Sequence, residues 1–411
     1  MKILVVSQYF WPENFRINDL VMELVKRGNE VTVLTGHPNY PEGKIFPEFK
    51  SNAESYGDYG GARVVRVPLF PRGVGSLRLM LNYLSFALSA SVLGPWKLRG
   101  KTFDVTFVCQ LSPVTVGIPA AILRKLKSAP IVFWILDLWP ESLRAVGVVR
   151  SPILLKGVGF LVSFIYRHCD LILAQSKSFI PEIKNYCSSN RWIEYFPSWS
   201  ESVFDFATTI PAPEVPVASG VFSVMFAGNI GDAQDFPAIL QAAEVLRNDR
   251  RIRWLIVGDG RAAAWVRREV EARGLTDSVL LLGRYPLERM PSFYMHADAL
   301  LVSLRDEPIF SMTIPGKLQS YLAAGKPVLA MLNGEGADLV QSSGSGLACR
   351  AGDGRALADA VLKLALMSDE ERKIMGNKAL DVNKSEFDRA TLISRLERWF
   401  ERVGSPANQD G

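Results

Sequence analysis

Cysteine and histidine are scarce in this chain, which has four cysteines and three histidines among 411 residues. The cysteines form no Cys-x-x-Cys pair and no Cys/His cluster, a spacing that disfavours a zinc site or a disulfide framework. No Asp-x-Asp motif occurs, so we expect no essential divalent metal and no cofactor. We interpret the cysteines as reduced core thiols in a cytoplasmic protein; they are Cys109, Cys169, Cys187 and Cys349.

Charge is also limited, since 22% of the residues are charged and the net charge is +5. The positive excess is not gathered into one long run, which disfavours nucleic acid as a partner. Anionic ligands and an anionic membrane surface remain partners of the right sign.

The chain has little that indicates a targeting or membrane-spanning segment. The apolar run from Met1 to Ser7 is short, so we interpret it as a buried strand rather than a signal peptide. Leu79–Trp96 carries no charge, but polar residues, a glycine and a proline interrupt it, which disfavours a true span. Two interpretations stay open: a helix buried in the fold, or an amphipathic helix lying on an anionic bilayer. Basic residues flank the segment at Arg72, Arg78, Lys97, Arg99 and Lys101.

In the first half, short runs rich in Val, Ile, Leu and Phe alternate with helical patterns. Runs without polar alternation are typical of strands buried on both faces of a parallel sheet, and the alternation predicts a doubly wound α/β domain. The predicted strands are Lys2–Ser7, Glu30–Thr35, Arg63–Pro68, Asp104–Val108, Pro130–Leu136 and Leu171–Ala174. The predicted helices are Asn18–Arg27, Leu77–Trp96, Val116–Lys127, Leu154–Arg167 and Ser178–Tyr186.

The same alternation restarts after a proline-rich stretch, which predicts a second α/β domain. We expect a first domain at 1–198, a linker at 199–219 and a second domain at 220–385. We expect helix 386–403 to pack back on the first domain, and 404–411 to be disordered. The predicted strands are Phe222–Ala227, Arg253–Val257, Val279–Leu282, Ala299–Ser303, Pro327–Met331 and Gly346–Cys349. The predicted helices are Pro237–Arg247, Ala262–Arg273, Glu288–Met295, Gly316–Ala324, Gly354–Leu366 and Ala390–Arg402.

Two such domains imply ligand sites at the carboxyl ends of their strands, facing a central cleft. Gly258-Asp259-Gly260 ends a predicted strand, where small residues let backbone amides approach an anion; the same tripeptide is also a common turn. Leu282-Gly283-Arg284-Tyr285 ends the next strand, and Arg284 is either a diphosphate clamp or a surface arginine.

Thr313–Val328 is the strongest motif: a loop, a helix, a glycine stop and a buried strand in sequence. The loop presents free amides from Gly316 and Lys317 at the helix N-terminus, and Lys317 adds a cation. Together they could neutralise a diphosphate leaving group, while Ser320 could meet a ribose hydroxyl.

With these motifs, the sequence resembles the retaining glycosyltransferases of family four, whose GT-B fold has two facing Rossmann-like domains. The resemblance covers nearly the whole chain in the family's order, through the two glycine motifs, Ala297-Asp298 and Ala323–Val328. Tyr9–Glu13 and Asp137–Ser142 are similar to a subgroup that includes the L-fucosamine (FucNAc) transferases of O-antigen and capsule assembly.

The resemblance implies transfer from a UDP-sugar to a lipid-diphosphate-linked saccharide in bacterial lipopolysaccharide or capsule synthesis. It also implies contact with the cytoplasmic face of the inner membrane. The implied nucleotide-sugar-binding residues are Asn229, Gly258, Asp259, Gly260, Arg284, Tyr285, Glu307, Ile314, Pro315, Gly316, Lys317, Leu318 and Ser320.

The chain departs from the family at the donor site. Two glutamates common in the family correspond here to Met312 and Ser320, and Asp306 or Glu307 could replace the first. The family's arginine–lysine pair falls in Gly228–Gln234, where the counterparts Asn229 and Gln234 are neutral. Arg284, Lys317 and backbone amides must then balance the diphosphate charge.

On the acceptor side, Asp137 follows a predicted strand and could orient or deprotonate an acceptor hydroxyl. It could instead cap the helix entered through Pro140. We assign catalysis to Asp137, Lys317 and Arg284. The candidate acceptor-binding residues are Phe10, Pro12, Glu13, His37, Asn39 and Tyr40. A non-catalytic binding subunit and a UDP-sugar epimerase are the alternative functions.

Overall fold

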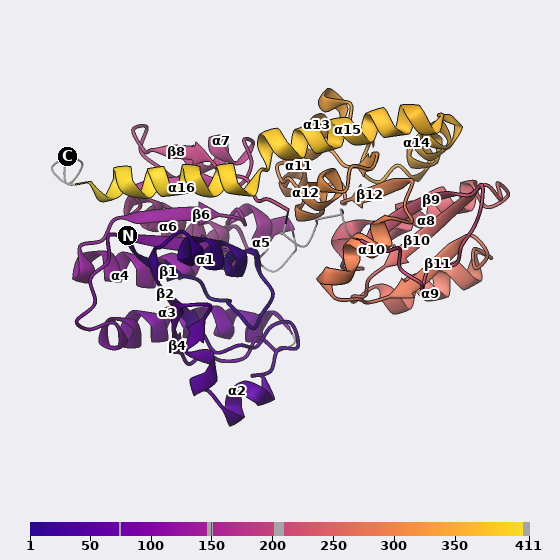
Figure 1. Ribbon diagram of the computed structural model, residues 1–411. Coiled ribbons are helices and arrows are strands. Elements are labelled where there is room, and N and C mark those ends of the chain that lie inside the picture. Colours follow the sequence, from indigo (N-terminus) through magenta and orange to yellow (C-terminus); the bar gives the residue numbers. More distant parts are fainter. Residues whose placement is uncertain (74, 146–148, 150, 201–208, 406–411) are drawn as a thin grey trace. The chain divides into compact units, whose positions relative to one another are not determined.

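The computed structural model describes residues 1–73, 75–145, 149, 151–200 and 209–405. The chain divides into two compact units, and each is described by itself (Figure 1). The first unit is Met1–Phe196 together with Ala390–Gly411, and the second is Pro197–Arg389. Part of the expected linker lies outside the described residues, as does most of the expected tail.

An eight-stranded sheet forms the centre of the first unit, in the order β3-β4-β2-β1-β5-β6-β7-β8. All neighbouring strands are parallel except β3 and β4. All six predicted strands are present, because their apolar runs are buried on both faces of the sheet. The strands are β1 (Lys2–Val6), β2 (Glu30–Gly36), β3 (Asp58–Tyr59), β4 (Ala62–Val67), β5 (Val105–Gln110), β6 (Ile131–Ile135), β7 (Leu171–Ala174) and β8 (Ile193–Tyr195).

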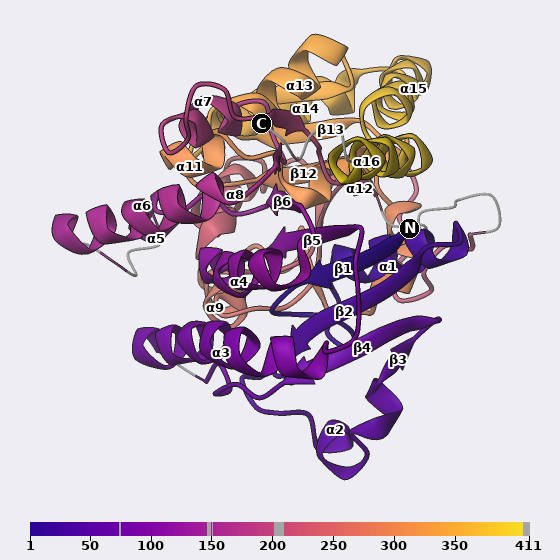
Figure 2. The same ribbon diagram turned by 90° about the vertical axis from the view of Figure 1, so that its left-hand side faces the viewer.

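Helices cover both faces of this sheet. Figure 2 shows α3, α4 and α6 side by side on one face, with α1 and α16 on the other. The chain reverses direction along the sheet between β4 and β5, and right-handed crossovers then place the following helices on the opposite face from α1. The helices are α1 (Arg16–Lys26), α2 (Pro47–Ser51), α3 (Ser76–Lys97), α4 (Gly117–Lys127), α5 (Glu141–Ala145), α6 (Pro152–Arg167), α7 (Phe179–Lys184) and α16 (Arg389–Gly404).

The second unit has a six-stranded parallel sheet in the order β11-β10-β9-β12-β13-β14. Its strands are β9 (Phe222–Ala227), β10 (Ile252–Val257), β11 (Val279–Gly283), β12 (Ala299–Ser303), β13 (Val328–Met331) and β14 (Gly346–Cys349). Its helices are α8 (Phe236–Val245), α9 (Ala263–Ala272), α10 (Met290–Tyr294), α11 (Pro308–Ser311), α12 (Gly316–Ala323), α13 (Glu335–Ser343), α14 (Gly354–Leu366) and α15 (Asp369–Glu386).

Successive residues of β9 enter two separate hydrophobic clusters, one on each face of the second sheet. Val224 and Phe226 pack with α8, α9 and α14, whereas Met225 and Ala227 pack with α10 and α12. This two-sided burial explains why the strand has no polar alternation. The predicted fold class, two parallel-sheet α/β domains, is therefore confirmed.

The last helix, α16, returns to the first unit and completes its core. Its buried residues include Phe400, whose ring lies 5.6 Å from that of Phe107 in β5. On its polar side, Arg27 forms an ion pair with Glu397 at 3.0 Å and donates a hydrogen bond to Ser394.

The helix before it, α15, was not expected from the sequence. Only Gly376 and Ala379 of α15 are buried, so it lacks a clear apolar stripe. A local signal was present, because Ser368 and Glu371 form a capping box: the Ser368 hydroxyl accepts from the Glu371 amide, and the Glu371 carboxylate accepts from the Ser368 amide. The helix expected after Pro140 is present as α5, whereas the other elements missed from the sequence are short or lie at edges: β3, β8, α2, α11 and α13.

We predict that Phe400→Ala destabilises the first unit by about 3–5 kcal/mol, because it removes a fully buried ring and leaves a cavity against β5. Hydrogen exchange should accelerate in β5 and leave the second-unit strands unchanged. The exposed neighbour, Glu401→Ala, is the matched control. Equal exchange in β5 for both variants would show that α16 does not support this sheet.

Candidate functional site

In the second unit, the loops that follow β9 and β10 meet through glycine backbone. A Cβ added at Gly258 would lie 1.8 Å from the carbonyl oxygen of Gly228, and one at Gly260 would lie 2.3 Å from that of Ile230. Gly228 and Gly258 also have φ angles of 133° and 146°, which other residues rarely adopt. The glycines are thus required for the close approach of the two loops at the carboxyl edge of the sheet.

Tyr321 fixes the position of α12 against this edge. Its buried hydroxyl accepts a hydrogen bond from the Ala227 amide at 2.9 Å and donates one to the Ala227 carbonyl at 3.2 Å. Ala227 is the last residue of β9 and directly precedes Gly228. The N-terminus of α12 is therefore held beside the glycine loops.

Lys317, in the first turn of α12, points its ammonium into this corner. The Nζ atom lies 3.6 Å from the centroid of the Phe226 ring and has no hydrogen-bond partner among the described residues. Burial lowers the pKa of Lys317 to about 7. Gly228 provides the space, since a Cβ there would lie 2.5 Å from the lysine Cε. The result is a buried amine with a ring beneath it and no anionic partner in the part of the chain that the structure describes.

Three predicted donor residues line one small cavity, of about 180 Å³, at the ends of β9, β10 and β11. These are Gly258, Asp259 and Arg284, and the cavity also includes Arg267 of α9, which the sequence did not single out. Asp259 and Arg284 are exposed. Next to the cavity, Asn229 donates to the side-chain oxygen of Gln234 at 3.2 Å. The motifs on β10 and β11 are thus brought together.

The remaining donor-side candidates differ in how accessible they are. Ile314, Pro315, Leu318 and Ser320 are buried, Gly316 is exposed, and the Tyr285 ring packs 4.5 Å from that of Phe293.

The two acidic residues that could replace the family's first glutamate have different surroundings. Asp306 accepts a hydrogen bond from Asn333 at 2.8 Å and pairs with Arg350 at 3.3 Å. Within the described part of the chain, the half-buried Glu307 carboxylate has no such partner. Glu307 is therefore the better placed of the two to meet a ligand.

In the first unit, Asp137 follows β6 and its carboxylate accepts a hydrogen bond from the Trp139 indole at 2.9 Å. Burial raises the pKa of Asp137, against the opposing effects of the Ser142, Trp139 and Ser112 side chains. Its backbone carbonyl accepts from Gln110 at 2.6 Å. The side chain is held by an aromatic donor, so it presents a carboxyl group in a fixed orientation.

Glu13 acts as a brace between two loops of the first unit. One carboxylate oxygen accepts from the amides of Asn39 and Tyr40, both at 2.7 Å, and the other accepts from the Phe10 amide at 3.2 Å. Burial raises the pKa of Glu13 to about 7, although these three amides favour the charged form. The side chain is 3% exposed, so its role in this structure is to position the loops rather than to meet an acceptor directly.

The other predicted acceptor residues surround this brace. Phe10 and Asn39 are fully buried, whereas Pro12, His37 and Tyr40 are partly exposed. Burial lowers the pKa of His37, and Arg66 and Lys97 act in the same direction. Only the partly exposed three have side-chain surface that a ligand could contact here.

Several residues that build the two edges were missed from the sequence. Tyr321 and Phe226 look like ordinary core aromatics, and Asn82 lies inside an apolar helix. Asn82 is nevertheless a buried hub: its side-chain oxygen accepts from Gln8 at 2.7 Å and from the Tyr9 hydroxyl at 3.1 Å, and its amide donates to the Phe70 carbonyl at 2.6 Å. The one sequence signal for Asn82 is that a polar residue occupies a helical position that is expected to be buried.

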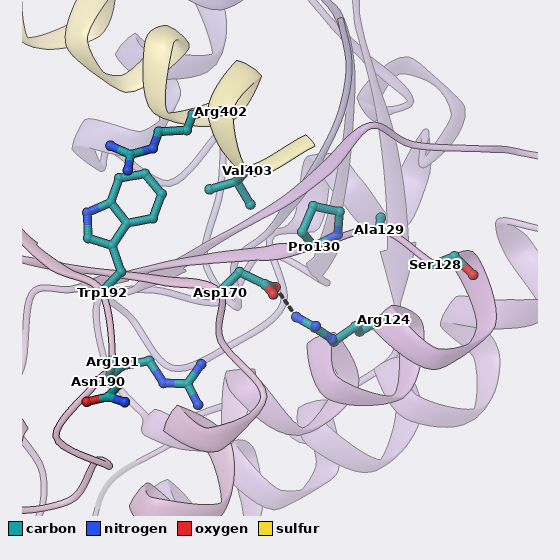
Figure 3. Close-up of a pocket in the computed structure, with 10 residues that line it drawn as sticks. All are labelled: Arg124, Ser128, Ala129, Pro130, Asp170, Asn190, Arg191, Trp192, Arg402 and Val403. Atoms are coloured by element: carbon teal, nitrogen blue, oxygen red, sulfur yellow. Dashed lines mark hydrogen bonds and ion pairs between the residues drawn. The ribbon is translucent and has the colours of Figure 1, made fainter. Parts of the chain in front are cut away.

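A second cavity, of about 630 Å³, lies at the opposite edge of the first sheet and contains none of the predicted site residues (Figure 3). It is lined by residues that precede β6, β7 and β8 and by α16. Its arginines already have partners: Arg124 pairs with Asp170, Arg191 donates to backbone carbonyls and Arg402 lies over the Trp192 ring. We interpret this cavity as the space left where α16 packs against the first sheet. No group of His, Cys, Asp and Glu suited to a metal ion occurs among the described residues.

Comparison with known families matches both units. Residues 14–185 match the family described as "Glycosyl transferase 4-like domain", and residues 222–366 match "Glycosyl transferases group 1". The chain belongs to the group 1 glycosyltransferases. The second match contains the glycine loops and Lys317, and the first contains Asp137 and His37 but begins just after Glu13.

Two curated glycosyltransferases are similar to this group 1 glycosyltransferase. WcaI of Escherichia coli K12, assigned by name to colanic acid biosynthesis, is 26% identical over 355 residues, which are 79% of this chain and 82% of the relative. WbjE of Pseudomonas aeruginosa is 28% identical over 251 residues, or 57% of this chain and 61% of the relative.

Solved structures agree with the fold. Anabaena HepE in complex with UDP and glucose has a TM-score of 0.67 at 16% identity, covering 98% of this chain and 99% of that one. The E. coli trehalose-6-phosphate protein bound to UDP-2-fluoro glucose has a TM-score of 0.70 at 13% identity, covering 98% and 99%. Both place this glycosyltransferase in the GT-B fold.

We predict that Tyr321→Phe lowers the free energy of unfolding by about 1–3 kcal/mol, because it leaves the buried Ala227 amide and carbonyl without their partner. Chemical denaturation measures this loss. The control is Tyr59→Phe, whose hydroxyl makes no hydrogen bond within the described residues and whose loss should cost under about 0.5 kcal/mol. A Tyr321→Phe protein as stable as this control would contradict the role assigned to the hydroxyl.

Proposed function

We propose that this glycosyltransferase moves a sugar from a UDP-sugar to a lipid-diphosphate-linked saccharide during bacterial surface-polysaccharide synthesis. The observation that carries the donor assignment is the unpaired Lys317 ammonium beside the glycine loops. A buried charge without an anion is costly, so its retention is best explained by an anionic ligand that completes the site. The sugar is proposed to be an N-acetylated amino sugar such as FucNAc.

The donor side works through electrostatics. The Lys317 ammonium, the Arg284 guanidinium and the exposed Gly316 amide would stabilise the negative charge that develops on the departing diphosphate. Asp259, or the backbone of Arg284–Pro286, would meet the nucleoside. Glu307, whose carboxylate has no partner in the described chain, would contact the donor sugar.

On the acceptor side, Asp137 would hold the attacking hydroxyl. We propose a retaining reaction without a metal ion. The bond between the anomeric carbon and the phosphate oxygen breaks, and UDP leaves. The acceptor oxygen then forms its bond on the same face of the sugar, and its proton passes to the departing phosphate. Asp137 orients that hydroxyl by accepting its hydrogen bond, and it takes no proton because the departing phosphate receives it.

The relatives support the pathway and donor class without settling either. WcaI is named for colanic acid synthesis, and solved neighbours hold UDP, UDP-glucose or UDP-2-fluoro glucose. A lipid-linked acceptor would place the reaction at the cytoplasmic face of the inner membrane. Met312 and Ser320, in place of two family glutamates, favour one competing function: a binding subunit that holds donor without transferring it.

The decisive experiment measures UDP release from a panel of UDP-sugars, with and without lipid-diphosphate-linked acceptors. We expect release with one donor class only when an acceptor is present. Conversion of the UDP-sugar into its epimer without an acceptor, and without net release of UDP, indicates an epimerase. Donor binding without release from any combination indicates a binding subunit.

Lys317→Met should lower kcat/KM by about 10²–10³-fold, the typical effect of removing one stabilising group from developing charge. The same change should raise the melting temperature by about 2–4 °C, because it removes an unpaired buried charge and keeps the side-chain volume. A thermal shift assay and initial rates measure both. Unchanged kcat/KM would exclude Lys317 from the reaction.

Protonation of Lys317 should accompany donor binding. Since burial lowers its pKa to about 7, the amine is mostly neutral at about pH 8 in the free protein. A diphosphate beside it favours the charged form and raises the pKa. Binding of UDP at about pH 8 should therefore take up close to one proton more in the wild type than in Lys317→Met. Calorimetry in buffers of different ionisation enthalpy measures this difference, and equal uptake would contradict it.

A further inference from the structure

The outer face of α3 carries an uninterrupted apolar stripe. Leu77 and Leu88 are 75% and 69% exposed, and every exposed residue between Leu81 and Trp96 is apolar. The stripe follows the helical spacing of three and four residues. Its members are Leu77, Leu81, Leu84, Leu88, Val92 and Trp96.

The inner face of the same helix is well anchored, so the exposure of the stripe is not a packing failure. Tyr83, Phe86 and Ala90 are buried, and Asn82 makes the hydrogen bonds to the β1 end described above. Among the described residues, α3 is the one helix long and apolar enough to cross a membrane by length and composition. A helix with one face fixed to a sheet is suited to lie in a membrane surface, not to span it.

The neighbouring helices extend this face. α4 lies between α3 and α6, and the three are stacked side by side (Figure 2). On α6, Ile153 is 82% exposed and Phe160 is 66% exposed, with Leu154 and Phe164 beside them. On α4, Leu126 is exposed.

The charge of the three helices has a single sign. They contain 22, 11 and 16 residues and not one aspartate or glutamate. At the chain's average of 42 acidic residues in 411, about five would be expected. Their basic residues are Arg78, Lys97, Arg124, Lys125, Lys127, Lys156 and Arg167.

Because these three helices combine exposed apolar residues with basic residues and carry no acidic residue, the chemistry of the face restricts which partner can bind. A second copy of the same face would bring like charges together, which disfavours self-association. An anionic bilayer offers both an apolar layer for the leucines and headgroups that attract the cations. Trp96, with Arg99 4.9 Å from its ring centroid, ends the stripe with the aromatic type enriched at membrane interfaces.

We infer that α3, α4 and α6 form a docking face for an anionic lipid bilayer, with α3 lying in the plane of the membrane surface. This deepens the proposed function, because it rests on an acceptor whose lipid is embedded in that bilayer. The same helix contacts the acceptor edge: the Tyr83 ring lies 6.0 Å from that of Trp139, the residue that holds Asp137. Docking through α3 therefore places the acceptor edge next to the membrane.

The test is co-sedimentation of the full chain with vesicles of phosphatidylcholine alone or with phosphatidylglycerol added, at low and high salt. We expect binding to the mixed vesicles that weakens with salt. The variant Leu81→Gln/Leu84→Gln/Leu88→Gln should bind at least about tenfold more weakly, since a tenfold loss needs only about 1.4 kcal/mol. The matched control is Val245→Gln/Leu366→Gln, which changes exposed apolar residues of the second unit and should bind as the wild type does.

Three outcomes would overturn the inference: no binding to either vesicle, equal binding to both, or equal loss in the control. Concentration-dependent dimerisation abolished by the triple variant would assign the face to a second copy instead. Melting temperatures show whether each variant is folded. Transfer to a detergent-solubilised acceptor separates the two proposals. If transfer occurs but the protein does not bind vesicles, the docking proposal is wrong and the proposed function stands. If the protein binds vesicles but no transfer occurs, the proposed function is wrong and the docking proposal stands.

Discussion

The unpaired ammonium of Lys317 is the constraint around which the second unit's carboxyl edge is built. A buried cation needs either water or an anion, and here an aromatic ring is its nearest partner. Keeping it in place requires Gly228, whose missing side chain makes room, and Tyr321, whose hydroxyl ties α12 to β9. The glycines at 258 and 260 then let the adjoining loop close against the first. One electrostatic requirement thus accounts for residues from three separate segments.

The first unit solves a different problem, because its carboxyl edge is made of long loops rather than glycine turns. Buried polar side chains hold these loops: Glu13 gathers three backbone amides, and Asn82 links β1, the loop before α3 and α3 itself. The free-energy cost of burying such polar groups is offset only when all of their hydrogen bonds are made. The consequence is an edge whose shape is coupled to α3, because that helix also contacts Trp139, the residue that holds Asp137, through Tyr83.

The sequence predicted the strands and the order of the units well, because strands buried on both sides have an unmistakable composition, as in β9 and β10. It failed for α15, whose polar surface offers no periodicity, and for β8, whose three half-buried residues give too short a signal. The glycine motifs and Lys317 were found because their residue types are chemically specific. The hydrogen bonds between Tyr321 and Ala227 join residues 94 positions apart in the sequence, so the local sequence around neither residue predicts them. Glu13 and Asn39 were predicted to contact the acceptor, but both are buried in the folded unit, where they hold loops in place, and burial cannot be predicted from the residue type alone.

The return of α16 to the first unit restricts how recombination can exchange the two units. Because the chain enters and leaves through the first unit, the second unit is an insertion flanked by Phe196 and Ala390. A single recombination event cannot exchange the first unit whole, since it would separate β5 from the helix that covers it. The second unit, by contrast, is continuous in sequence from Pro197 to Arg389, so two breakpoints exchange it whole. Exchange of the second unit, the proposed donor side, is thus topologically simple, whereas exchange of the first unit, the proposed acceptor side, requires the last helix to be carried along with it.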